Sequence, residues 1–259
     1  MRVLTRPDGP YSINRASVQA IGLIGWFPLG GVIRGNNSAH NVALDQSYTV
    51  SNANPVWRPD ASLGIVPYWA ASRYRPQLAG SVGEQFSIFA IFKRTETRSG
   101  RWVWGTGNQT VNNCQIHMGT NSVTTVNFNF WNNDLSVTVP NIVNSWQWMA
   151  AVYDKTLPSN NQKIYLQGVL VGQRTNTTGF LGTQEHYLGW RQGFDESFYG
   201  EVADVRVYNR ALSADEVWQL WAPETRWELY QPVRVPQAYV AGGAPPVATG
   251  RSWAVMIGG

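Results

Sequence analysis

Short runs of apolar residues, each bounded by turn residues, recur along most of this chain. FSIFAIFK at residues 86–93 is apolar on both faces, the pattern of a strand covered on two sides. VTTVNFNFW at 123–131 alternates, with Val126, Phe128 and Phe130 on one face and asparagines and a tryptophan on the other. A spacing of roughly 10 to 20 residues between such runs predicts a two-sheet antiparallel sandwich in an all-β domain.

Further runs extend the same pattern. Residues 163–172 predict a hairpin, because Gln167-Gly168 stands where a two-residue turn requires positive φ. The other predicted strands are 101–105, 114–119, 146–154 and 186–190.

One short helix is predicted near the end of the domain, over residues 213–221. Ser213 and Glu216 have the spacing of a capping box, in which each side chain binds a backbone amide at the helix start. Val217, Leu220 and Trp221 then form one apolar face.

The two ends of the chain differ from this pattern. Residues 1–20 lack alternation, and residues 222–259 contain five prolines and five glycines together with large apolar side chains. We therefore divide the chain into an N-terminal arm (1–20), a sandwich domain (21–222) and an extended C-terminal arm (223–259). The arm is expected to pack on its own domain or on a neighbour.

Composition narrows the classes of function. The net charge is +4, but the basic residues are almost all arginine and are spread along the chain, which argues against nucleic acid. No apolar run is long enough to span a membrane, the opening residues carry no signal-peptide pattern, and the single Cys114 allows no internal disulfide. The 13 tryptophans and 14% charged residues suit either a protein interface or a sugar-binding surface.

The sequence gives little indication of a catalytic site or a metal site. Glu201 and Asp204 are three positions apart, which predicts opposite faces of a strand and no carboxylate pair for glycoside hydrolysis. His40, His117 and His186 lack the spacing of metal ligands. We therefore expect no catalytic site, no bound metal and no cofactor.

Aromatic residues beside asparagine-rich turns are the candidates for sugar binding. Aromatic faces stack on sugar rings, and amides and charged groups bind hydroxyls. The competing interpretation is that the asparagines serve turn geometry and the tryptophans serve packing. The candidate residues are Trp104, Asn108, Trp131, Asn133, Trp190 and Arg191.

The stretch FYGEVADVRVYNRALSADEVWQLW at 198–221 resembles the end of laminin-G-like, concanavalin A-like jelly-roll domains. GLIGWFPLGG at 22–31 and KIYLQGVLVG at 163–172 resemble other strands of that family. The resemblance implies two curved antiparallel sheets with one short C-terminal helix. Ala203 replaces an acidic residue of the family pattern, which implies the loss of a structural calcium ion.

Residues 226–236, RWELYQPVRVP, resemble a tail of laminin-G-like proteins from tailed bacteriophages. This resemblance implies a non-enzymatic virion protein, made in a host cytoplasm, that oligomerises and contacts capsid or tail subunits. Its expected interface residues are Arg226, Trp227, Tyr230 and Arg234. The alternative is a carbohydrate-binding module that attaches the particle to glycans.

Overall fold

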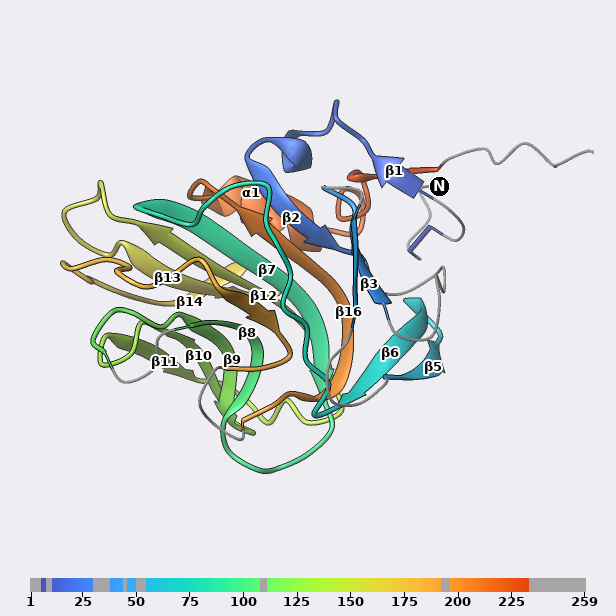
Figure 1. The fold of residues 1–259 in the computed structure, drawn as a ribbon, viewed down its shortest axis with the longest axis horizontal. Helices are drawn as coiled ribbons and strands as arrows, with labels where there is room; N and C mark the ends of the chain where they lie inside the picture. The colour runs from blue at the N-terminus through green and yellow to red at the C-terminus, as the bar shows by residue number, and fades with distance from the viewer. Residues whose placement is uncertain are drawn as a thin grey trace, which may run out of the picture.

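The computed structural model is a β-sandwich and describes residues 6–7, 11–29, 38–43, 46–49, 55–107, 111–191 and 196–232 (Figure 1). Its elements are β1 (Tyr11–Ile13), η1 (Val18–Ala20), β2 (Leu23–Phe27), β3 (Ser38–Asn41), β4 (Gln46–Thr49), β5 (Val56–Asp60), β6 (Gly64–Ala70), β7 (Gln85–Arg94), β8 (Arg101–Thr106), β9 (His117–Ser122), β10 (Thr125–Asn129), β11 (Asp134–Thr138), β12 (Trp146–Asp154), β13 (Gln162–Leu166), β14 (Val169–Arg174), β15 (His186–Leu188), β16 (Tyr199–Tyr208), α1 (Ala214–Trp221) and β17 (Tyr230–Pro232).

Two antiparallel sheets form the sandwich, as the alternation predicts. The smaller sheet has the strand order β11-β10-β9-β8-β15. The larger sheet has the order β14-β13-β12-β7-β16-β6-β5, and β2 also pairs with β16. We call the face of each sheet that is turned toward the other sheet its inner face, and the opposite one its outer face.

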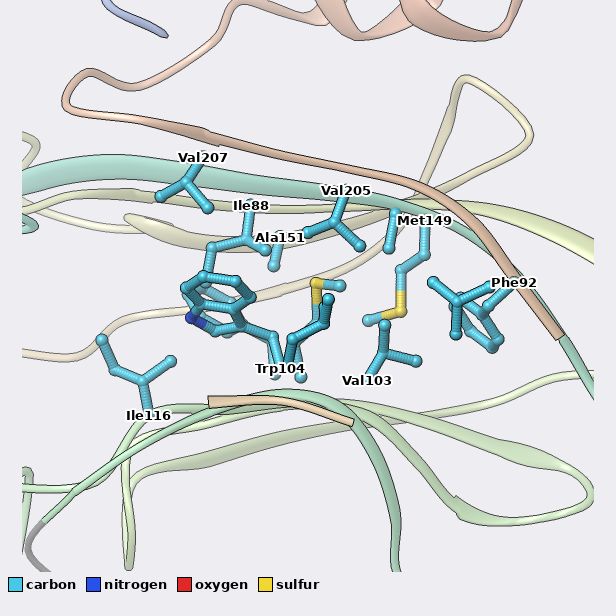
Figure 2. Close-up of a cluster of buried hydrophobic side chains, with 14 of the residues drawn as sticks. Ile88, Phe92, Val103, Trp104, Ile116, Met149, Ala151, Val205 and Val207 are labelled. Atoms are coloured by element: carbon cyan, nitrogen blue, oxygen red, sulfur yellow. The ribbon is translucent and has the colours of Figure 1, made fainter. Parts of the chain in front are cut away.

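The main core lies between the two inner faces (Figure 2). Val103, Trp104 and Ile116 of the smaller sheet and its flanks point toward Met149 and Val205 of the larger one. Val126, Phe128 and Phe130 are also in this core, as predicted from their alternation. Burying each such side chain stabilises the fold by about 1.5–3 kcal/mol.

The larger sheet is covered on its outer face as well, which is why FSIFAIFK is apolar on both sides. Phe89 and Ile91 of β7 lie in this second core, and α1 contributes Val217 and Leu220. Figure 1 shows α1 on the side of the large sheet that faces away from the smaller sheet. Packing in the second core is therefore a role of α1.

The described parts of both predicted arms pack on this same outer face. β1 pairs with β17, and Tyr11 packs against Trp26 and Tyr230. Trp227, Leu229 and Tyr230 are buried in the second core. Residues 11–20 and 223–232 thus cover a sheet of their own chain.

Local predictions at the helix and the hairpin are confirmed. Ser213 caps α1, and both hydrogen bonds of its capping box with Glu216 are present. Gln167 and Gly168 have φ values of 51° and 78° at the turn between β13 and β14.

The prediction that Glu201 and Asp204 point to opposite faces is wrong. Glu201 lies opposite Lys93 and Asp204 lies opposite Ile91, two residues apart on β7. A β-bulge between Val202 and Asp204 adds one residue to β16 and brings both carboxylates to the outer face.

Candidate functional site

A row of side chains crosses the outer face of the smaller sheet from one edge to the other. The register places Asp134 (β11) opposite Asn129 (β10), Asn129 opposite His117 (β9), His117 opposite Gly105 (β8), and Gly105 opposite Tyr187 (β15). Directly opposite residues of an antiparallel pair share a face, so the five residues line up. We call this row the polar strip.

Gly105 has no side chain, and the backbone of residues 190–191 occupies the space above it. A Cβ atom at this position would lie 2.5 Å from the backbone oxygen of Trp190 and 3.0 Å from the Cα of Arg191. Glycine therefore lets residues 190–191 cross close above β8, and this crossing carries the Arg191 side chain onto the strip.

Arg191 links the strip to two tryptophans. Its Nη1 lies 3.3 Å from Nε2 of His117, and its Nη2 lies 2.7 Å from Oε2 of Glu196. The guanidinium carbon lies 5.3 Å from the ring centroid of Trp131 and 5.4 Å from that of Trp102, within the range of cation–π attraction.

Glu196 is held from two directions. Besides pairing with Arg191, its Oε2 accepts a hydrogen bond of 2.6 Å from Nε1 of Trp102. Its neighbour Ser197 forms an isolated bridge with Trp102, which ties this segment to β8. The carboxylate therefore neutralises Arg191 and fixes the indole ring.

His117 is a neutral group in the middle of the strip. Burial, reinforced by the positive charge of Arg191, lowers its pKa well below the usual range. Its neutral Nε2 accepts from Arg191, and the Asn129 amide nitrogen lies 3.0 Å away. The amide oxygen of Asn129 has no hydrogen-bond partner among the described residues.

The turn between β10 and β11 brings a strained tryptophan to one end of the strip. Trp131 and Asn132 have φ values of 51° and 64°, in the left-handed region. Asparagine tolerates this region, whereas a bulky residue there is an outlier. Asn132 and Asn133 fasten the turn through bonds of 2.6 Å to Asn112 and 2.8 Å to Asn113. Trp131 is partly exposed.

Asp134 ends the strip at the exposed edge strand. Its backbone oxygen accepts a hydrogen bond of 2.7 Å from Nη1 of Arg174, whose Nη2 lies 3.3 Å from Oδ1 of Asn133. Desolvation raises the pKa of its carboxyl, against the opposing effects of the Phe130 amide and of Arg174.

Three of the six predicted sugar-binding residues, Trp131, Asn133 and Arg191, gather at this end of the strip. Trp190 lies at the other end, with its ring 4.9 Å from that of Tyr187 and the guanidinium of Arg73 4.3 Å from it. Trp104 does not face the surface: it is fully buried in the main core, because a β-bulge between Trp102 and Trp104 turns Trp102 outward instead. Asn108 lies outside the described residues.

Sequence reasoning missed the middle of the strip. The predicted alternation places Asn129 on the same face as Asn127 and Trp131, but it does not mark Asn129 as a site residue. Nothing in the chain order joins Trp102, His117 and Glu196, which meet only when the sheet has formed.

The carboxylates Glu201 and Asp204 have structural partners. Glu201 pairs with Lys93, which also approaches Asp60. Asp204 pairs with Arg206 at 2.7 Å and accepts from Trp26 at 3.0 Å and from Tyr230 at 3.1 Å. Both carboxylates therefore serve the second core and its border.

The described part of the chain contains no cluster of three or more His, Cys, Asp or Glu side chains able to hold a metal ion. Ala203 is fully buried in the second core. No helix in the described segments is long and apolar enough to cross a membrane.

The predicted interface residues are used inside the chain where they are described. Trp227 and Tyr230 pack edge to face, with ring centroids 5.4 Å apart, and are 8% and 5% exposed. The guanidinium of Arg226 lies 5.7 Å from the Trp148 ring. This burial leaves the two aromatic side chains little surface for a partner. The interface role of these residues stays a prediction, and Arg234 lies outside the described residues.

Comparison with known proteins places the fold. A family model described as the concanavalin A-like lectin/glucanases superfamily matches residues 75–218, more than half of the chain. Domain 4 of AbnA, an extracellular arabinanase from Geobacillus stearothermophilus solved with arabinotriose, is 17% identical with a TM-score of 0.58, over 77% of this chain and 98% of that domain.

A Trypanosoma rangeli sialidase is 14% identical with a TM-score of 0.56, over 78% of this chain. The match spans 32% of the sialidase, about a third of its length. At these identities the likenesses show a shared fold. A comparison with curated protein sequences gives no match.

Proposed function

The chain belongs to the concanavalin A-like lectin/glucanase superfamily, and on that premise we propose that it is a non-catalytic carbohydrate-binding module. The glycan binds at the end of the polar strip, where Trp131, Asn133 and Arg191 meet. Trp131 provides the apolar ring surface for a sugar, and the amide and charged groups around it bind hydroxyls.

The left-handed backbone conformation of Trp131 is the main observation behind this proposal. A tryptophan at φ 51° occupies a position that glycine or asparagine would fill with less strain, at a cost of roughly 1 kcal/mol. Strain of this kind is typical of functional positions, where a side chain is kept although its backbone conformation is unfavourable. The partly exposed ring, beside the guanidinium of Arg191, is what the strained turn presents.

The rest of the site is organised before a ligand arrives. Glu196 and His117 hold Arg191, and Asn113 and Arg174 hold Asn133. Groups fixed in advance lose little conformational freedom on binding, which favours affinity. The engagement of Glu201 with Lys93 and of Asp204 with Arg206 supports binding without hydrolysis.

The comparisons with known proteins also support a glycan as the ligand. The arabinanase domain, which this chain matches over nearly the whole of that domain, was solved with arabinotriose. The sialidase match spans about a third of that protein, so it supports the fold alone and does not indicate a particular sugar.

A glycan array followed by calorimetric titration of the best neutral and acidic probes tests the proposal. We expect Trp131→Asn to weaken binding at least tenfold, while the melting temperature is unchanged or higher because asparagine suits the left-handed turn. Trp218→Asn is the matched control, since Trp218 is 47% exposed on α1, on the opposite side of the sandwich. Equal loss of binding in both variants, or no loss in Trp131→Asn, would refute the assignment of the site.

The virion role stays a separate proposal. It rests on the resemblance of residues 226–236 to a phage tail segment, and most of the C-terminal arm lies outside the described residues. On this proposal the module is made in a host cytoplasm, oligomerises on the particle, and uses its glycan site for attachment.

A further inference from the structure

We infer that the glycan bound at the polar strip is a neutral saccharide, with hydroxyl groups that donate to the Asp134 carboxylate, and that carboxylated sugars are rejected. The inference rests on the proposed function and adds the class of ligand. It follows from how the charges of the site are already paired.

The two guanidinium groups of the site are occupied by the chain itself. Arg191 donates to Glu196 at 2.7 Å and to His117 at 3.3 Å. Arg174 donates to the backbone oxygen of Asp134 at 2.7 Å and to Asn133 at 3.3 Å. A ligand carboxylate would have to displace Glu196, which would leave Glu196 and the Trp102 N–H without their partners.

His117 does not supply a positive charge for an anionic sugar. His117 is 2% exposed and faces Arg191, Asn129 and Trp102. Burial beside a guanidinium keeps the imidazole neutral. Among the described residues at the Trp131 end of the strip, Arg191 and Arg174 therefore already bind groups of the chain itself.

Asp134 adds repulsion at the accessible end. It is exposed, and its carboxylate interacts electrostatically with Arg191, whose guanidinium carbon lies 5.3 Å from the centroid of the Trp131 ring. A sugar stacked on the indole ring therefore meets this carboxylate. A carboxylate only accepts hydrogen bonds, and two neighbouring hydroxyls of a neutral sugar can donate to its two oxygens. The same group repels a carboxylated sugar.

The test compares matched neutral and acidic probes. Lactose is compared with sialyllactose, which adds one acidic sugar, and a galactose trimer with a galacturonate trimer, which has a carboxylate on every ring. Binding of the wild-type chain is measured by array and by titration at pH 7, together with Trp131→Asn, Asp134→Asn and Asp215→Asn. Asp215 lies in the first turn of α1, so its variant has the same change in net charge on the opposite side of the sandwich.

We expect neutral probes to bind and their acidic counterparts to bind at least tenfold more weakly. Asp134→Asn should weaken the neutral probe about tenfold, because a charge-assisted hydrogen bond is roughly twice as strong as a neutral one. The same variant should narrow the gap to the acidic probe, and Asp215→Asn should change neither affinity.

The failures are distinguishable. Trp131-dependent binding of acidic probes as tight as that of their neutral counterparts, or an Asp134→Asn variant that matches the wild type, would overturn the inference and leave the proposed function standing. Binding of no probe, neutral or acidic, would overturn both. Melting curves of each variant show whether a loss of binding reflects unfolding.

Discussion

Acid should destabilise this fold through His186, a residue outside the proposed site. His186 begins β15 and is 2% exposed, with its ring 5.5 Å from that of Trp104. Neither ring nitrogen has a hydrogen-bond partner in the described structure. Burial lowers the pKa of His186 from 6.5 to about 4, because nothing in this environment compensates a positive charge.

The sign and size of the effect follow from proton linkage. Between pH 6.5 and pH 4 the unfolded chain binds a proton at His186 and the folded chain does not, so the free energy of unfolding falls as the pH falls. A difference of about 2.5 pKa units would remove about 3 kcal/mol once the pH reaches 4, most of it already lost at pH 4.5. The contribution is fully present above pH 7.

Urea unfolding of the wild type and of His186→Leu between pH 7 and pH 4.5 measures this term. Leucine has a similar size and cannot titrate, so the variant should lose less stability on acidification, by about 2.5 kcal/mol over this range. Carboxylates and His117 titrate in both proteins, and their contributions cancel in the comparison. The result that would refute the reasoning is an equal loss of stability in the two proteins, which would mean that His186 finds a partner or reaches water when protonated.

Three other outcomes are expected. Ser213→Ala should lower the free energy of unfolding by about 1 kcal/mol through loss of the helix cap, as urea unfolding would show. Deleting residues 233–259 should change the melting temperature by no more than a few degrees. If the virion proposal holds, the same deletion should abolish co-sedimentation with phage particles that lack the protein. A deletion that begins at residue 223 should also unfold the second core, which needs Trp227 and Leu229. Calcium should not raise the melting temperature by more than a few degrees, because Ala203 replaces the expected ligand.

The sequence alone determined the elements that depend on interactions between residues close together in the chain. The alternation around Phe128 predicts the inward face of β10, because side chains of a strand point to opposite sides in turn. Ser213 and Glu216 specify the start of α1 through bonds within four residues, and Gln167-Gly168 specify the turn between β13 and β14. The doubly apolar β7 also indicated a strand covered on two sides, although what covers it was left open.

Strand register decided what the sequence could not. One extra residue in β16 brings Asp204 to the same face as Glu201, and another bulge buries Trp104 and turns Trp102 outward. A bulge depends on the pairing between strands, and the glycines near these two bulges, Gly119 and Gly200, do not by themselves give the position of the extra residue. A prediction based on strict alternation therefore fails from the bulge onward.

The candidate site was only partly predictable for the same reason. Trp131 and Asn133 lie in one turn whose composition marks it, but Arg191 and Glu196 are distant in the chain. They reach the strip because β15 pairs with β8 and Gly105 lets the following loop cross above it. Which polar groups meet, and which charges neutralise one another, is set by contacts across strands, and these form only when the hydrophobic core has fixed the register of the sheet.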